Sequence, residues 1–302
     1  MKRSIHKITK SLLIVLITFF IGSGDYGASQ KAKKKSVFLT VHIIDVGQGD
    51  AIYIDLFGRK KVLIDCGPPS RFYKYYYSQK KKRGVRYFVK KFNIKTLDQF
   101  IISHPQIDHI GGLSILLKKI KVKEVLDPGY AYPSRYYESI LKLIEKKKIK
   151  YRIVRRGLKY QLEGVQFEIL SPAKLITYTR SNVNANSIVL KVVYKDISFL
   201  FTGDIEQETE AMLLSLKDKL KSTFLKAPHH GSETSSTLDF LRLVQPRSVF
   251  ISCGANNIFG HPSPTTLKRY AKLNIPVYRT DIHGTISIQT NGYTYKIRRE
   301  SG

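Results

Sequence analysis

Residues 103–112 read SHPQIDHIGG and directly follow the apolar run FII at residues 100–102. Such a run is typical of a buried strand, and the paired glycines that close the stretch favour a tight entry into a helix. His104, Asp108 and His109 carry imidazole and carboxylate groups, which are common metal ligands. The stretch therefore indicates a metal site at the end of a strand, if other parts of the chain complete it.

Three later clusters of the same residue types also follow apolar, strand-like runs. They are TGD at residues 202–204, HHGS at residues 229–232 and FGHP at residues 259–262. Loops that leave one edge of a sheet converge in α/β folds, so these clusters can meet in space. Four such clusters are hard to explain as packing, and together they predict a site for one or two divalent ions.

Strand-like and helix-like patterns alternate along the chain in two similar halves. Each half begins with β-branched apolar runs and continues with strands that alternate with helices. Two sheets packed face to face, with helices outside, satisfy this order with one core, so we expect an α/β sandwich over residues 37–302. Asn291 and Gly292 predict a two-residue hairpin between the last two strands, and Cys66 and Cys253 are expected to be small buried residues.

The first 29 residues have the pattern of an export signal. Basic residues in positions 1–10 precede the apolar run SLLIVLITFFIG, which ends before small residues up to Ser29. The run is shorter than the roughly 20 residues that span a bilayer. Residues 30–36 then read as a basic linker. We expect export, with membrane anchoring or peripheral membrane contact if the signal stays uncleaved.

The chain carries a large positive charge. Lys and Arg total 52 against 23 Asp and Glu in 302 residues, a formal net charge of +29. This charge favours DNA, another anionic polymer or an anionic membrane surface as a partner, and no protein partner is evident. A proteome that is generally rich in lysine is the alternative explanation, because the lysines are spread along the whole chain.

The ordered motifs resemble those of the metallo-β-lactamase fold. The pattern H-x-x-x-D-H-x-G-G, then T-G-D and H-H-G-S, belongs to that fold, and IDVGQGDAIYI, NANSIVL, LKAPHHGS and FGHPSP are most similar to the hydrolase domain of ComEC-type competence proteins. The resemblance covers nearly all of residues 38–298. It implies an αββα sandwich of two mixed β-sheets with external helices. It also implies hydrolysis of phosphodiesters by a metal-activated water, as in the degradation of the DNA strand that competence proteins do not import.

The resemblance implies a set of metal ligands. One ion would be bound by Asp108, His109 and His230, and Asp204 would bridge it to a second ion bound by His104. Asp108 alone could instead cap the helix that follows it, since Asp is favoured at helix N-termini.

Further roles follow from the same resemblance. Asp108 or Asp204 would also accept the proton of the attacking water. His229 would lie beside the substrate phosphate, and His261 would contact that phosphate or protonate the leaving oxygen. His229 and His230 compete for one ligand position, and His230 is the favoured ligand. Three aspartates would orient the ligands: Asp45, Asp50 and Asp65.

Two departures from the family pattern affect the second ion. Gln106 stands where the family has an acidic residue or a histidine, and residues 182–187 (NVNANS) replace a third histidine. Amide oxygens of Gln106, Asn184 and Asn186 could serve a harder ion, so Mn²⁺ and Mg²⁺ are candidates besides Zn²⁺. Alternatively, the His104 side binds weakly and fills only with substrate.

A basic aromatic stretch, RFYKYYYSQKKKRGVRYFVKK at residues 71–91, precedes the metal motif. Tyrosines between cations suit a single strand, because bases stack on rings while cations follow the phosphates. The alternative is a solvated loop and helix. Candidate substrate contacts are Ser232, Lys80, Lys81, Lys82 and Arg83.

Three functions remain open from the sequence. The first is an exported, metal-dependent nuclease acting on DNA. The second is a phosphodiesterase of cell-surface polymers such as phosphorylcholine-teichoic acid. The third is a catalytically weak, cationic protein that binds DNA or a surface.

Overall fold

Apolar runs form two β-sheets in the computed structural model, which describes residues 37–69 and 84–300. The first sheet has eight strands, in the order β15 (Tyr295–Arg299), β14 (Ile286–Thr290), β1 (Leu39–Ile43), β2 (Ile52–Leu56), β3 (Lys60–Ile64), β4 (Thr96–Ile101), β5 (Lys121–Asp127) and β6 (Lys150–Ile153). Strands β3 to β6 are parallel and the other neighbours are antiparallel. The carboxyl ends of the parallel strands therefore meet at one edge.

The second sheet has seven strands with the same mixture of pairings. Its order is β13 (Val277–Arg279), β12 (Ser248–Ile251), β11 (Phe224–Lys226), β10 (Ile197–Phe201), β9 (Val189–Tyr194), β8 (Val165–Ser171) and β7 (Lys159–Leu162). Strands β10 to β13 are parallel, whereas β7 to β10 are antiparallel. Each sheet thus has a parallel half, whose strand ends supply loops to the site.

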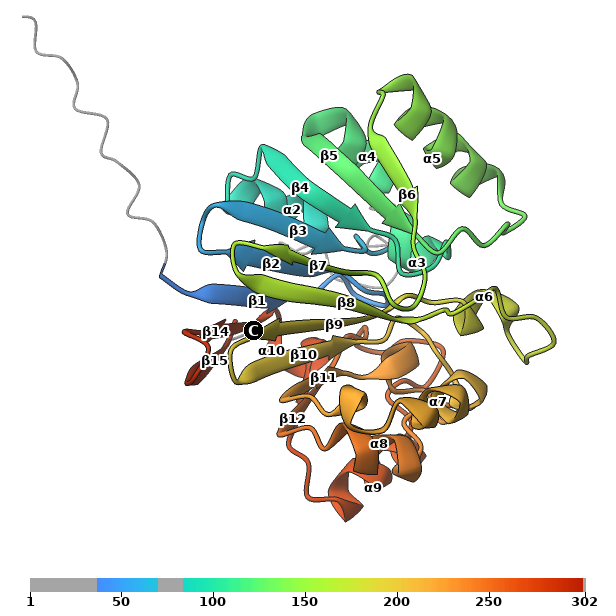
Figure 1. The fold of residues 1–302 in the computed structure, drawn as a ribbon, viewed down its shortest axis with the longest axis vertical. Coiled ribbons are helices and arrows are strands. Elements are labelled where there is room, and N and C mark those ends of the chain that lie inside the picture. Colours follow the sequence, from blue (N-terminus) through green and yellow to red (C-terminus); the bar gives the residue numbers. More distant parts are fainter. Residues whose placement is uncertain (1–36, 70–83, 301–302) are drawn as a thin grey trace, which may run out of the picture. The chain divides into compact units, whose positions relative to one another are not determined.

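Helices cover the outer face of each sheet, so the protein has four layers (Figure 1). Helices α2 (Val85–Lys91), α4 (Leu113–Lys119) and α5 (Arg135–Lys146) pack on the first sheet, and α7 (Gln207–Leu213), α8 (Leu238–Val244) and α9 (Pro264–Lys272) pack on the second. Between the sheets, Val41, Phe167 and Phe199 belong to one buried cluster. Each fully buried side chain of this kind stabilises the fold by about 2 kcal/mol. The predicted αββα sandwich is confirmed.

The turn between the last two strands differs from the sequence prediction. Thr290 pairs with Tyr295, so the hairpin has four loop residues and not two. The Asn291 side chain accepts hydrogen bonds from the backbone N–H groups of Tyr293 and Thr294, at 3.0 and 2.9 Å. This side-chain turn competes with the tight two-residue turn that the Asn-Gly pair predicts.

Several predictions fall outside the described residues. They concern the export signal at residues 1–29, the linker at residues 30–36, and Lys80, Lys81, Lys82 and Arg83. Only the end of the basic aromatic stretch is described, and it forms α2. No helix within residues 37–69 and 84–300 is both long enough and apolar enough to cross a membrane. Cys66 and Cys253 are buried, as predicted, and both are free thiols.

Candidate metal centre

Four predicted ligands come together at the shared edge of the two sheets. Asp108 and His109 lie in α3 (Ile107–Ile110), which follows β4. Asp204 follows β10, and His230 lies in a tight turn after β11. One donor atom from each residue lies within 4.8 Å of the other three. Parallel strands from both sheets therefore deliver the ligand residues to one place.

The donor atoms converge on a space that fits one divalent ion. Asp204 Oδ2 lies 3.2 Å from His109 Nε2 and 3.3 Å from His230 Nε2. Asp108 Oδ2 lies 3.4 Å from His230 Nε2. His230 Nε2 and Asp204 Oδ1 are buried without a hydrogen-bond partner among the described residues. Buried polar atoms are normally paired, so this set of two imidazoles and two carboxylates fits a tetrahedral metal site.

Neighbouring groups fix the orientation of both imidazole rings. His109 Nδ1 donates to Asp65 Oδ2 at 2.8 Å, and Asp65 also accepts from the Ser103 backbone N–H. His230 Nδ1 donates to the Ser252 carbonyl oxygen at 2.9 Å and lies 3.4 Å from Asp50 Oδ1. A ring that donates through Nδ1 presents the lone pair of Nε2 to a metal. The predicted orienting roles of Asp50 and Asp65 agree with these contacts.

The loop that carries Asp50 depends on a glycine. Gly49 has φ +131°, and a Cβ at this position would lie 2.1 Å from the Asp108 carbonyl oxygen. The Asp50 N–H donates to the same oxygen at 3.3 Å. Only glycine therefore permits this approach between the loop and α3.

Opposite charges balance within the cluster. Burial opposes protonation of His109 and His230, yet the carboxylate of Asp204 helps to raise the pKa of each imidazole well above its ordinary value. Burial likewise opposes ionisation of Asp204, but the two histidines hold its pKa well below the usual range. A divalent cation can replace the positive charge of these imidazoles, so the cluster is built for positive charge.

His104 lies beside the cluster, but its ring nitrogens have other partners. Its Nε2 donates to the amide oxygen of Gln106 at 2.9 Å, and its Nδ1 lies 3.1 Å from the Ser103 hydroxyl. The distance from His104 Nε2 to Asp204 Oδ2 is 4.0 Å. Burial, aided by the charge of His109, lowers the pKa of His104 to about 4. Ligation of a second ion by His104 therefore stays a prediction, and it requires Gln106 to move.

Two predicted ligand or orienting residues, Asn186 and Asp45, form hydrogen bonds within their own loops. The Asn186 amide bonds the backbone of Ile176 and the carbonyl oxygen of Asn182, so it stabilises its own loop. Asp45 Oδ1 accepts from the Gly47 N–H and closes a turn. A role of either residue at the metal site stays a prediction, because a short polar side chain in a glycine- or asparagine-rich loop also bonds its neighbouring backbone.

The remaining predicted residues differ in how they meet the site. Asn184 lines the cavity, and its buried Oδ1 has no hydrogen-bond partner among the described residues. His229 also lines the cavity, with Nδ1 3.0 Å from Glu206 Oε1. His261 lies against His229, with ring centroids 5.4 Å apart. Ser232 is buried, and its hydroxyl bonds Thr234, so it supports the turn and does not line the cavity.

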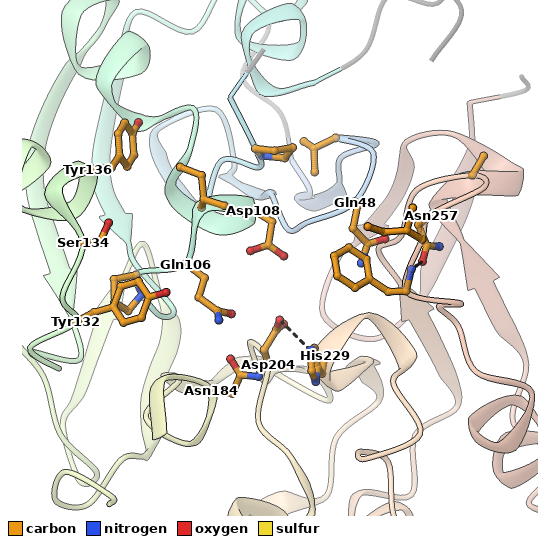
Figure 2. A pocket seen from close by; sticks show the side chains of 17 residues that line it. Gln48, Gln106, Asp108, Tyr132, Ser134, Tyr136, Asn184, Asp204, His229 and Asn257 are labelled. Atoms are coloured by element: carbon orange, nitrogen blue, oxygen red, sulfur yellow. Dashed lines mark hydrogen bonds and ion pairs between the residues drawn. The ribbon is translucent and has the colours of Figure 1, made fainter. Parts of the chain in front are cut away.

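The cluster opens into a cavity of about 410 Å³ (Figure 2). Asp108 points into it from one side, and Asp204, Asn184 and His229 point in from the opposite side. Tyr132 and Asn257 lie on the two flanks. No role was predicted from the sequence for Tyr132 and Glu206, which no motif marks, or for Lys226 and Phe259, which lie within the motifs LKAPHHGS and FGHPSP.

A four-layer αββα sandwich with an Asp–His cluster between its sheets defines the metallo-β-lactamase class of proteins. The model of the metallo-beta-lactamase superfamily matches residues 44–255, and the chain belongs to this superfamily. Among curated proteins, the chain is 34% identical over 266 residues to ComE operon protein 3 of Bacillus subtilis (strain 168), covering 85% of this chain and 33% of that protein. It is 28% identical to competence protein ComA of Neisseria gonorrhoeae, covering 82% and 31%.

The chain thus spans about a third of the length of these competence proteins. Among solved structures, it is similar to the metallo-beta-lactamase fold protein YhfI of Bacillus subtilis, with a TM-score of 0.53, 12% identity, and coverage of 85% of this chain and 100% of that one. It is also similar to Igni18, a metallo hydrolase of Ignicoccus hospitalis, with a TM-score of 0.50, 16% identity, and coverage of 82% and 98%. At these identities the structural matches establish the fold. The fold and the similarity to ComEC-type competence proteins agree with the resemblance found in the sequence.

Proposed function

We propose that this chain is an exported, metal-dependent phosphodiesterase that cleaves DNA. The observation that carries the proposal is the buried cluster of Asp108, His109, Asp204 and His230, which opens into a cavity on a protein of net charge +29. A phosphodiester is an anion that water attacks slowly, so its hydrolysis needs both an activated water and a positive site. A bound divalent ion supplies both. The similarity to competence proteins favours DNA over other phosphodiesters.

Side chains of the protein itself would accept the proton of the attacking water and contact the phosphate oxygens. Asp108 has a side chain that is 29% exposed and faces the cavity, so it can accept the proton of the attacking water. His229 lies between two carboxylates, with Nδ1 3.0 Å from Glu206 Oε1 and Nε2 4.0 Å from Asp204 Oδ2, so its protonated ring can contact a phosphate oxygen beside the cluster. His261 packs against His229 and His230, and its own Nδ1 has no hydrogen-bond partner among the described residues. Contact of His261 with the leaving oxygen stays a prediction from the sequence, because His261 packs behind His229 and is not among the residues that line the cavity.

Export is proposed from the N-terminal sequence, and the competence-protein relatives suggest a place at the cell envelope. N-terminal sequencing of the chain recovered from its host tests this directly. A start after Ser29 supports a cleaved signal, and an intact N-terminus in the membrane fraction supports an anchor. A start at Met1 in the soluble cytoplasmic fraction would contradict export.

The catalytic proposal is tested with the purified protein and three substrates. They are single-stranded DNA, double-stranded DNA and bis-(p-nitrophenyl) phosphate, each with Mn²⁺, Zn²⁺ or EDTA. We expect DNA cleavage only with metal, and loss of cleavage in Asp108→Ala but not in Asp239→Ala, which removes a surface carboxylate at the start of α8.

Other outcomes would refute the nuclease. Hydrolysis of the small ester with DNA left intact would indicate a phosphodiesterase of surface polymers. Binding of DNA without turnover in any metal would indicate a cationic binding protein. Cleavage that persists in Asp108→Ala would show that DNA hydrolysis does not depend on Asp108 in the metal cluster.

A further inference from the structure

The cavity beside the metal cluster has an apolar wall that the proposed mechanism does not use. Ile258 and Phe259 line this wall, and their side chains are 75% and 62% exposed. Apolar side chains that remain together in solvent at the rim of a cavity are typical of a ligand contact. Folding alone gives no reason for this exposure.

The loop that presents Phe259 is held in place by one side chain. Asn257 Oδ1 accepts from the backbone N–H groups of Phe259 and His261, at 3.1 and 3.0 Å. Asn257 Nδ2 donates to the carbonyl oxygens of Gly254 and His261, at 2.9 and 2.5 Å. The Gly254 N–H in turn donates to the side chain of Gln48. The exposed ring therefore stands on a preorganised loop, which lowers the entropy lost when a ligand binds.

The Phe259 ring continues a series of rings that leads to the metal cluster. It stacks on His261, with ring centroids 5.8 Å apart and ring planes 24° apart. His261 lies 5.4 Å from His229, which lines the cavity beside Asp204. A second aromatic residue, Tyr132, lies on the flank of the cavity opposite Asn257, with Asp108 and Asp204 between the flanks (Figure 2). A group on either ring would thus share one cavity with a phosphate held at the cluster.

We propose, building on the proposed nuclease function, that Phe259 is a stacking platform for an unpaired nucleobase adjacent to the scissile phosphate. Every base has a flat π-face that stacks on an aromatic side chain regardless of sequence. Inside a duplex both faces of a base are covered by its neighbours, so only a single strand, a frayed end or an extruded base can use the platform. The net charge of +29 over the whole chain favours an anionic ligand such as a nucleotide over a cationic headgroup. The substrate class is accordingly single-stranded DNA.

The test compares two oligonucleotides of the same length, one with bases and one with abasic residues throughout. Wild type, Phe259→Ala, Phe259→Trp and Tyr293→Ala are assayed with Mn²⁺ for cleavage, and with EDTA for equilibrium binding by fluorescence anisotropy. Tyr293 is the matched control, because it is an aromatic residue of nearly equal exposure, 61%, in the hairpin between β14 and β15. We expect Phe259→Ala to lower kcat/KM and affinity about tenfold or more on the base-bearing strand only. Phe259→Trp should restore both, and wild type should cut a blunt duplex more slowly than the single strand.

The outcomes separate the platform from the nuclease. An equal loss on both oligonucleotides would mean that Phe259 only supports His261, and no loss on the base-bearing strand would also overturn the proposal. Equal kcat/KM on duplex and single strand would contradict an unpaired base. If wild type cuts neither oligonucleotide with any metal, the nuclease fails. The platform then stands or falls on whether the bases strengthen binding in EDTA and whether Phe259→Ala removes that gain.

Discussion

A buried ion pair behind the metal cluster gives a sharp test of how the site is supported. Lys226 in β11 and Asp50 in the loop after β1 are both almost fully buried, and Lys226 Nζ lies 2.7 Å from Asp50 Oδ2. Lys226 also donates to the Ala227 carbonyl oxygen at 2.8 Å. Asp50 in turn lies 3.4 Å from His230 Nδ1. Burial opposes the charge on Asp50, and Lys226 and His230 hold its pKa low. Lys226 therefore stabilises the carboxylate that helps to orient His230.

Lys226→Met keeps the length of the side chain but leaves Asp50 as a buried carboxylate without its cation. Breaking a buried pair from one side costs about 3–5 kcal/mol, whereas replacing both partners by neutral groups is often much less costly. We expect Lys226→Met to lower the free energy of unfolding by about 3 kcal/mol, which lowers Tm by roughly 6–12 °C in a domain of this size. Lys226→Met combined with Asp50→Asn should be more stable than Lys226→Met alone by at least about 1 kcal/mol.

Urea denaturation of wild type, Lys226→Met, Asp50→Asn and the double variant measures the coupling free energy between Lys226 and Asp50. Lys123→Met is the matched control, because Lys123 forms a half-exposed ion pair with Asp98 and its loss should cost less than about 1 kcal/mol. Two results would refute the reasoning: a Lys226→Met cost as small as that of the control, or costs of the two single substitutions that simply add in the double variant.

Three further predictions concern the metal centre and the protein's response to pH. Gln106→Asp replaces the amide oxygen that accepts from His104 Nε2 by a carboxylate. After dialysis in Mn²⁺, the metal content should rise from about one ion per chain toward two. An unchanged metal content would show that Gln106 does not limit the second site. Asp65→Ala removes the acceptor that orients His109, so the metal affinity measured by chelator competition should fall about 10- to 100-fold. An affinity equal to that of wild type would show that Asp65 does not support metal binding. Burial raises the pKa of Glu210 from 4.5 to about 7, so the folded state holds this proton more tightly than the unfolded state. Its contribution to stability is fully present below pH 4.5 and is lost as pH rises through 7. The stability of wild type relative to Glu210→Gln should therefore fall by about 3 kcal/mol over this range in paired denaturation curves, and parallel curves would contradict the assignment.

The part of the site that the sequence predicts is the part that follows strand ends. Asp108, His109, Asp204 and His230 each come shortly after an apolar strand, and parallel strands bring their ends to one edge whatever the loops do. The loops decide the rest. Asn186 and His104 carry atoms that could bind a metal. In the structure, however, these atoms form hydrogen bonds with the Ile176 backbone and with Gln106. Such hydrogen bonds depend on the conformation of the loops, and the periodicity of apolar residues in the sequence does not predict loop conformation.

Contacts between distant parts of the chain could not be predicted from the sequence either. The Lys226–Asp50 pair joins the two sheets, and a lysine within an apolar strand gives no sign of its partner. Phe259 stands next to the glycine of a recognised motif, FGHPSP, yet only the structure shows that its ring is exposed at the cavity. An apolar pair within an asparagine- and glycine-rich loop was the one signal that could have marked it.

The position of β1 constrains the order in which the protein can mature. β1 lies between β2, which follows it directly, and β14, which is made near the end of the chain. Until residues 286–290 have been synthesised, one edge of β1 has unpaired N–H and C=O groups and can join a strand of another molecule. Pairing over so long a separation is also slow. The loop after β1 carries Asp50, which lies 3.4 Å from His230, so we expect the metal centre to reach its final geometry only after β14 has paired with β1.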